Sequence, residues 1–208
     1  AIIAAFLANM GIAIAKFIAW GISGSASMLA EAVHSVADSG NQLLLLLGGR
    51  KAKRMADSDH PFGYGRERYV YAFVVSIILF SIGGVFSIYE GVNKLTHPHM
   101  LTNWWIPVGV LVIAIVLESF SLRTAVRESN HVRLPGQSWV SFVRHSKAPE
   151  LPVVLLEDVG ALVGLCFALF GVGMTVLTGN PLFDALGTLM IGVLLVAIAI
   201  ILGIETKS

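Results

Sequence analysis

Long apolar segments alternate along the chain with short polar ones. Six of the apolar segments reach the length of about 20 residues that a helix needs to cross a membrane. They cover roughly residues 2–22, 25–49, 69–95, 104–126, 151–177 and 183–204. A turn, Thr178-Gly179-Asn180-Pro181, separates the last two. The pattern predicts an all-α membrane protein in which residues 1–208 form one domain, a bundle of six transmembrane helices.

The composition strengthens this prediction. Hydrophobic residues make up 56% of the chain and charged residues only 13%, with a mean hydropathy of +0.80. Soluble domains carry about 25% charged residues. A net charge of +1 gives no reason to expect a nucleic-acid partner. The single cysteine, Cys166, excludes a disulfide framework and a cysteine-rich metal site within the chain.

The distribution of positive charge predicts the orientation in the membrane. Twelve of the fourteen Lys and Arg residues flank the loop after the second span, flank the loop after the fourth span, or follow the sixth span. Of the other two, Lys94 lies on the opposite side and Lys16 lies within the first span. Because cytoplasmic loops carry the excess of Lys and Arg, both basic loops and both termini are expected in the cytoplasm.

The second span contains ionisable residues, which are costly inside a membrane. Glu31, His34 and Asp38 follow the spacing i, i+3 and i+7, so a helix places them along one stripe. Each charged group at mid-bilayer costs roughly 2.5 to 3.5 kcal/mol on insertion scales, and such residues usually mark an ion or proton path. His34 and Asp38, four residues apart, can grip one ion. The alternative is a histidine that is hydrogen-bonded to a neighbouring helix.

The fifth span adds two adjacent acids, Glu157 and Asp158. Since adjacent residues stand about 100° apart on a helix, only one of them is expected to face the stripe of the second span squarely. Gly160 and Gly164 follow as a GxxxG pair, which favours the close approach of another helix. Glu90, Glu118 and Asp184 lie in or near the ends of other spans, where each is a candidate for a proton relay or a water-cavity residue, although a hydrogen-bonded position near the interface is favoured.

The ionisable residues of the second and fifth spans are predicted to lie at similar depths in the membrane. Counting 1.5 Å of rise per residue, His34 and Asp38 fall near mid-bilayer, and Asp158 falls within a turn or two of that depth. One imidazole and two carboxylates suit zinc, whereas Mg²⁺ and Ca²⁺ prefer oxygen ligands alone. Glu157, Asn41 and water are the candidates for the fourth ligand.

The same residues predict energy coupling. Ligands must lose protons before they bind a metal, so binding expels protons and protonation expels the metal. His34, Asp38 and Asp158 are the proton-coupling candidates, with Glu31 as a further one. His34 leads because its reference pKa lies near neutrality. Alternating exposure of the site to each face would exchange metal for protons.

Both basic loops carry possible sites of their own. Asp57, Asp59 and His60 lie close enough in sequence to hold a second metal, although a solvated turn explains them equally. Trp139, Phe142 and Val143 follow the spacing i, i+3 and i+4, which predicts a short helix in the headgroup layer. An ordinary linker is the alternative.

The sequence resembles the cation diffusion facilitator family, six-span zinc transporters that act as metal/proton antiporters. The motifs that carry the resemblance are residues 27–38 with His34 and Asp38, the loop His60-Pro61-Phe62-Gly63-Tyr64-Gly65, and Leu155-Leu156-Glu157-Asp158. The Leu-Leu-Glu-Asp run and the Thr-Gly-Asn-Pro-Leu-Phe-Asp turn at 178–184 resemble the branch of the mitochondrial-type zinc transporters.

The resemblance implies a residue pair four apart on each of spans two and five. Span two matches with His34 and Asp38, but on span five only Asp158 matches, because Val154 stands where the family has a ligand. In the loop, Asp57 and His60 resemble an accessory metal site, with Tyr64 in place of a histidine. The family also implies a homodimer and a cytoplasmic C-terminal domain, which is expected to be absent from this chain.

Other functions fit the sequence less well. The HExxH motif of a zinc protease is absent, and Gly21-Ile22-Ser23-Gly24 has the letters of a rhomboid-like protease but lies in a turn. We therefore expect no enzyme and no cofactor. The expected function is a secondary transporter that exports Zn²⁺, with Mn²⁺, Fe²⁺ or Co²⁺ as alternatives; a passive metal channel or a metal sensor is the rival. The expected location is the cytoplasmic membrane of a bacterium or an organelle membrane of a eukaryote.

Overall fold

A computed structural model describes residues 2–52, 65–145 and 150–205, and within these ranges the chain is helical, with no strand. The helices are α1 (Ile2–Ser23), α2 (Ala26–Ala52), α3 (Gly65–Thr96), α4 (Trp105–Val132), α5 (Trp139–His145), α6 (Glu150–Thr178) and α7 (Leu182–Glu205). Each of the six predicted spans falls on one long helix. The all-α prediction is therefore confirmed for the described residues.

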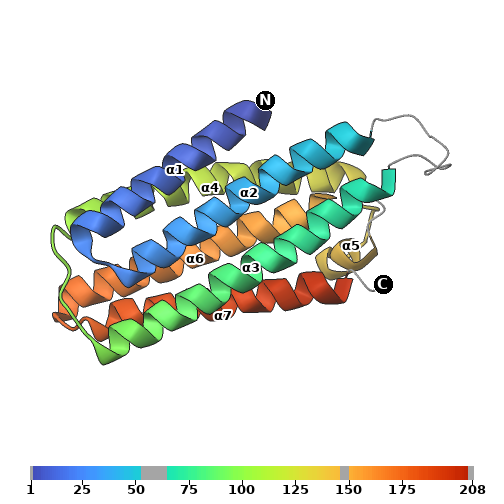
Figure 1. Cartoon of the computed structure of the whole chain (residues 1–208). Helices are drawn as coiled ribbons and strands as arrows, with labels where there is room; N and C mark the ends of the chain where they lie inside the picture. The colour runs from blue at the N-terminus through green and yellow to red at the C-terminus, as the bar shows by residue number, and fades with distance from the viewer. Residues whose placement is uncertain (1, 53–64, 146–149, 206–208) are drawn as a thin grey trace.

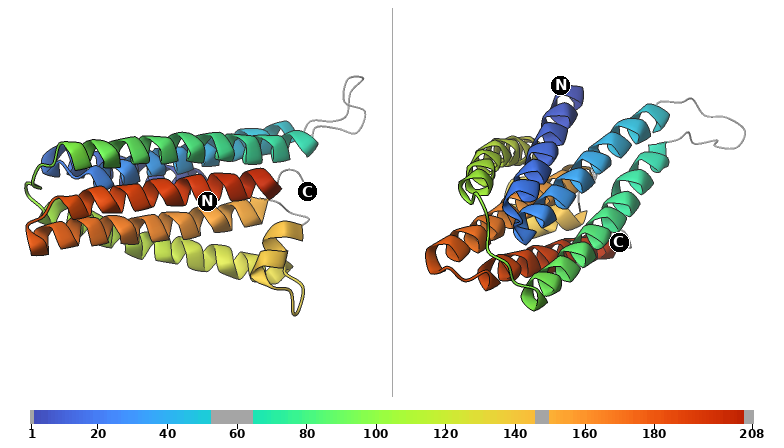
Figure 2. Two further views of the ribbon diagram at one scale, coloured as in Figure 1. Left: turned by 90° about the horizontal axis from the view of Figure 1, so that it is seen from below. Right: turned by 60° about the vertical axis from the view of Figure 1, so that its left-hand side comes forward.

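The six long helices run side by side as one bundle, and the short α5 lies beside one end (Figures 1 and 2). Neighbours around the bundle are α1 and α2, α2 and α3, α3 and α7, α7 and α6, α6 and α4, and α4 and α1. This closes a ring in which α2 also contacts α6 and α7. Polar residues of α2 and α6 can therefore meet inside the bundle.

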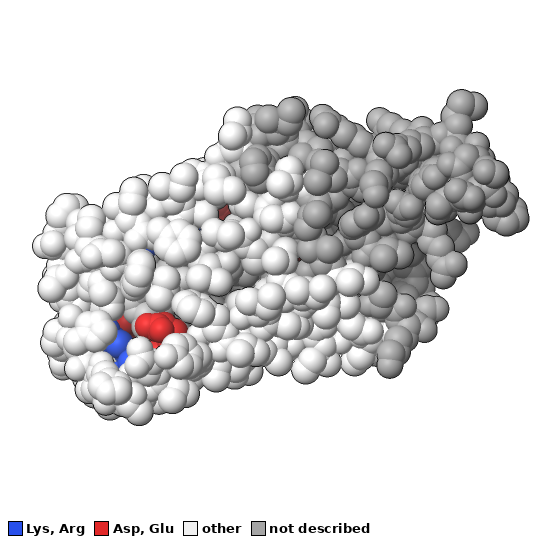
Figure 3. All heavy atoms as spheres, in the orientation of Figure 1, with Lys and Arg blue, Asp and Glu red and all other residues white. Residues whose placement is uncertain are grey.

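Four segments among the described residues are long and apolar enough to cross a membrane. They are Ser76–Thr96, Trp105–Val132, Pro152–Thr178 and Leu182–Ile204, and a shorter apolar stretch covers Asn9–Ser23 of α1. The surface agrees with them, since in Figure 3 the described face is almost entirely uncharged, apart from acidic and basic atoms near the left end. Length and composition thus support the predicted crossing for α3, α4, α6 and α7.

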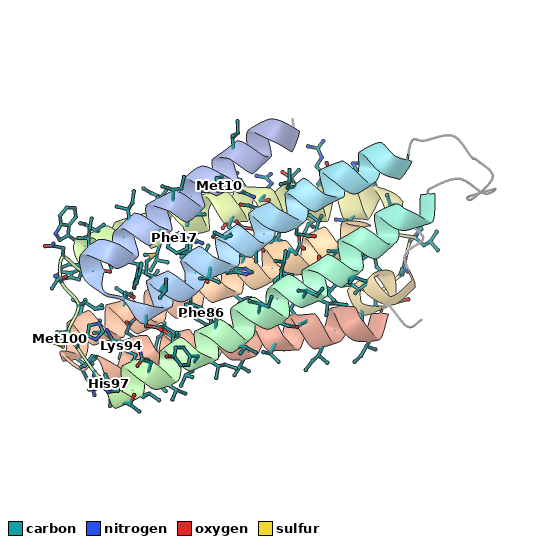
Figure 4. All side chains as sticks on the ribbon, viewed as in Figure 1. Met10, Phe17, Phe86, Lys94, His97 and Met100 are labelled. Carbon is teal, nitrogen blue, oxygen red and sulfur yellow. The ribbon has the colours of Figure 1, made fainter. Side chains whose placement is uncertain are left out.

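A buried carboxylate joins three helices at the end opposite the basic loops. Asp184 of α7 accepts hydrogen bonds from the backbone N–H groups of Ala26 and Ser27, at 2.8 and 3.2 Å, and from the hydroxyls of Ser25 and Ser27. It also lies 3.6 Å from the ammonium of Lys94 on α3, which Figure 4 shows near His97 at that end. A carboxylate at a helix N-terminus satisfies donors that the helix itself leaves free. The expected hydrogen-bonded position of Asp184 is confirmed.

Glycines let α6 approach its neighbours closely. A Cβ atom on Gly187 of α7 would lie 2.8 Å from the carbonyl oxygen of Phe167, so no side chain fits there. Of the predicted GxxxG pair, Gly160 faces Ile198 of α7, and a Cβ on Gly164 would lie 2.5 Å from Glu31 Oε1 of α2. The close approach predicted for this pair is confirmed, with a different helix at each glycine.

The second basic loop contains the helix that the sequence predicts. It covers Trp139–His145 as α5, and Phe142 is buried against the bundle with only 2% of its surface exposed. The rings of Trp139 and Phe142 meet edge to face, with centroids 6.2 Å apart. An ordinary linker is therefore wrong for this segment.

Candidate functional site

The stripe predicted on the second span faces the inside of the bundle. Glu31 is 0% exposed and His34 is 1% exposed, and the side chain of Asp38 is 18% exposed. His34 Nε2 and Asp38 Oδ2 lie 3.4 Å apart, one helical turn from each other. The predicted spacing therefore brings the imidazole and the carboxylate together.

His34 has an unusual environment for a buried histidine. Its ring lies beside the ring of Phe80 on α3, with centroids 5.6 Å apart. Among the described residues, neither ring nitrogen of His34 has a hydrogen-bond partner. Buried polar atoms are normally satisfied, so the alternative of a histidine that is hydrogen-bonded to a neighbouring helix is not supported by this part of the chain.

Asp38 opens onto a polar cavity of about 30 Å³, which has room for one or two water-sized species. Four carboxyl groups from three helices line it: Asp38 of α2, Glu118 of α4, and Glu157 and Asp158 of α6. Such a concentration of acids inside a bundle suits a cation. Of the residues predicted to converge, Asp38 and Asp158 line this cavity, whereas His34 does not.

The two adjacent acids of α6 diverge, yet both line the cavity. Glu157 accepts hydrogen bonds from Asn41 of α2 and, at 3.2 Å, from Ser76 of α3. Asp158 accepts one from Ser121 of α4 at 3.1 Å. Among the described residues, only Glu157 of the two is hydrogen-bonded to α2, as expected for adjacent residues about 100° apart, whereas Asp158 reaches the cavity on the α4 side.

The candidate metal ligands lie near one another, but they do not converge on one point. Within the described ranges, no three His, Cys, Asp or Glu side chains are placed to hold one ion. Val154 does not line the cavity. Asn41, a candidate fourth ligand, donates its amide to Glu157 and leaves its own Oδ1 without a partner in this part of the chain. Binding of an ion would require side-chain rotation.

Lys16 is the buried cation of the site, and sequence reasoning passed over it. Its ammonium lies 2.9 Å from Glu31 Oε2 and 2.7 Å from Ser35 Oγ, and its stem also lines the cavity. Glu31 is thus an ion-pair partner and is not among the residues that line the cavity. The signal was present, since a lysine inside an apolar span needs an acidic partner.

Glu118 is the second residue that sequence reasoning placed elsewhere. Of the two expectations for Glu118, the structure favours a residue of a polar cavity over a position at the interface, because Glu118 lines the cavity together with Asp158. The helix α4 runs from Trp105 to Val132, so 14 residues follow Glu118. Glu118 therefore lies well inside α4.

The predicted accessory site cannot be compared with the structure. Asp57, Asp59 and His60, together with Tyr64, lie outside the described residues.

Nearly the whole chain is similar in sequence to known proteins. The profile of the cation efflux transmembrane domain matches residues 2–208. The chain is 39% identical over 181 residues to the human (Homo sapiens) proton-coupled zinc antiporter SLC30A9, mitochondrial, which covers 86% of this chain and 32% of that protein. It is 32% identical over 188 residues to metal tolerance protein C4 of Arabidopsis thaliana, covering 90% of this chain and 41% of the relative.

A more distant relative is the magnetosome protein MamB of Magnetospira sp. (strain QH-2), 27% identical over 206 residues, or 97% of this chain and 63% of the relative. The chain spans about a third of the length of the human relative and two fifths of the plant one. The matched profile covers the helices that carry the cavity. The chain therefore belongs to the cation diffusion facilitator family of cation-efflux transporters, in the branch of the zinc antiporters.

Proposed function

We propose that the chain is the membrane part of a proton-coupled zinc transporter that binds Zn²⁺ through His34, Asp38 and Asp158. The observation that carries the proposal is that four of the six buried side-chain polar atoms without a hydrogen-bond partner among the described residues belong to His34, Asp38 and Asn41: both His34 nitrogens, Asp38 Oδ1 and Asn41 Oδ1. They lie on one face of α2, next to a cavity lined by acids. Buried polar atoms are normally hydrogen-bonded, so a cluster of them without hydrogen-bond partners indicates a place where a ligand binds.

Charge favours a divalent ion. Two carboxylates and a neutral imidazole balance a dication in a region that tolerates little net charge. The human relative is named a proton-coupled zinc antiporter, which supports zinc over Mn²⁺, Fe²⁺ and Co²⁺ for this chain. Glu157, Asn41 and water remain the candidates for the fourth ligand, and Asp57, Asp59 and His60 for an accessory site.

The exchange follows from competition between protons and metal. Zinc displaces protons from His34, Asp38 and Asp158 on one side of the membrane, and protons displace zinc on the other. Glu31 contributes through Lys16, which it holds beside the cavity. The protein acts as a transporter and not as an enzyme, and it needs no cofactor.

The proposed arrangement has six spans, α1 to α4, α6 and α7, with both termini and the basic loops in the cytoplasm. Residues 1–208 belong to one transmembrane domain, and two copies associate. In a bacterium the membrane is the cytoplasmic membrane, and in a eukaryote it is that of an organelle. The human relative is named a mitochondrial protein, which favours a mitochondrial location in a eukaryote.

Uptake into proteoliposomes tests the proposal. The full-length protein is reconstituted with an imposed pH gradient, and lumenal zinc and pH are followed together. We expect zinc movement opposite to proton movement in the parent, loss of both in Asp38→Ala and Asp158→Ala, and parental rates in Glu128→Gln, an exposed acid on the same α4 as the cavity residue Glu118. Zinc flux without proton counterflow would make the protein a channel, and zinc binding without flux would make it a sensor.

A second comparison identifies the fourth ligand. Glu157→Gln keeps an acceptor for Asn41 but removes the charge. If Glu157 binds zinc, this variant should lose transport as completely as Asp158→Ala; if water completes the coordination, transport should persist at a reduced rate.

A further inference from the structure

A second cavity, separate from the polar one, lies at the basic end of the bundle. It has a volume of about 530 Å³, within the range of ligand pockets. Side chains of four helices line it, and all of them are apolar or aromatic; they include Val126 of α4, Trp139 and Val140 of α5, Leu156 and Val159 of α6, and Ile201 of α7. None of these residues lines the cavity of the proposed transport site.

The cavity is open to its surroundings. Val140 is 66% exposed, and Val159 and Ile201 are each 41% exposed. Large apolar surface of this kind is stable only when another apolar group covers it.

The position of the cavity indicates what covers it. Its α4, α6 and α7 walls belong to segments long and apolar enough to cross a membrane, close to the basic end of each segment. The α5 wall lies outside these segments, in the connection between α4 and α6. The cavity thus straddles the boundary between hydrocarbon and headgroups, the depth at which a phospholipid passes from acyl chain to phosphate.

A positive charge stands at this boundary. Arg133, which follows α4 as its C-cap residue, holds its guanidinium 4.2 Å from the centre of the Trp139 ring. Its backbone N–H is fixed by the carbonyl of Ser129 at 2.9 Å, so the start of its side chain is held in place. Among the described residues it pairs with no carboxylate. Stacking on a ring leaves the edge of a guanidinium free to bind phosphate oxygens.

We infer that this cavity is a lipid site: one acyl chain of an anionic phospholipid fills it, and Arg133 binds the phosphate. The helix α5 forms the wall that distinguishes the site from an ordinary lipid-facing surface, because α5 covers the bound acyl chain from the headgroup side. Arginine near a membrane surface favours an anionic headgroup by a factor of about five. The inference does not depend on metal transport, so it stands or fails separately from the proposed function.

Fluorescence quenching tests the site directly. The chain has four tryptophans, and Trp139 lines the cavity; a variant with Trp20, Trp104 and Trp105 replaced by Phe reports on it alone. The variant is reconstituted in vesicles that contain small fractions of phosphatidylglycerol or phosphatidylcholine with brominated acyl chains. We expect half-maximal quenching at about a fivefold lower mole fraction of the brominated phosphatidylglycerol.

Matched variants separate the phosphate contact from general attraction to a basic surface. Arg133→Gln should remove the difference between the two lipids, whereas Arg127→Gln, an exposed arginine on the same helix, should preserve it. Val126→Phe, which fills part of the cavity, should reduce quenching by both lipids. Equal quenching by both lipids in the parent would overturn the anionic site. Absence of quenching would show that another occupant, such as a second copy of the chain, covers the cavity.

Discussion

Removal of the buried ammonium of Lys16 should destabilise the protein strongly. The side chains of Lys16 and Glu31 are 4% and 0% exposed, and Lys16→Met would leave Glu31 without its partner at 2.9 Å and Ser35 without its donor at 2.7 Å. Glu31 Oε1 already lacks a hydrogen-bond partner among the described residues, so the remaining carboxylate would be poorly compensated. Breaking a buried ion pair from one side costs about 3–5 kcal/mol.

The double variant tests the cause of the loss. Lys16→Met/Glu31→Gln removes both charges, and its free energy of unfolding should return to within about 1–2 kcal/mol of the parent, because replacing a whole buried pair is often nearly neutral. Unfolding in mixed micelles of increasing sodium dodecyl sulfate content, followed by circular dichroism, measures each variant. If the double variant loses as much stability as the two single variants together, the ion pair does not couple α1 to α2.

Three further predictions concern the packing and the cavity. Gly187→Ala should lose about 1–3 kcal/mol of stability from overpacking against α6, whereas Gly173→Ala, whose Cβ meets nothing within 4 Å, should gain up to about 1 kcal/mol; equal thermal shifts would contradict the contact. Asp184→Asn should cost about 3–5 kcal/mol by leaving a buried ammonium unpaired, and a parental melting temperature in detergent would refute this. Glu118→Gln should weaken zinc binding at least about tenfold in calorimetric titration, because it removes the charge of one of the four carboxyl groups that line the cavity; unchanged affinity would remove Glu118 from the site.

Hydropathy predicted the helices well but not their full lengths. Each apolar run of the sequence became a helix, and the turn at 178–181 holds Gly179 in a left-handed conformation with φ of 68° at the end of α6. The polar end of α4, up to Val132, was missed because hydropathy detects the hydrocarbon layer, whereas helix formation continues beyond it. The amphipathic spacing of α5 sufficed to predict even a helix of 7 residues.

The contacts of the candidate site also fall into those that the sequence predicts and those that it does not. Contacts within one helix, such as that between His34 and Asp38, follow from spacing alone. Contacts between helices, such as Asn41 with Glu157 and Ser121 with Asp158, depend on how each helix is rotated and shifted against its neighbour. These rotations depend on how whole helices pack against one another, in part at glycines, so no single sequence position encodes them.

The carboxylate of Asp184 also constrains the order of assembly. It completes the N-terminus of α2, yet it lies 157 to 159 residues further along the chain. A ribosome delivers α2 to the membrane long before α7, so the N–H groups of Ala26 and Ser27 lack this carboxylate acceptor until the last helix is inserted. A nascent chain that stops before α7 therefore carries an unfinished helix at the start of its second span.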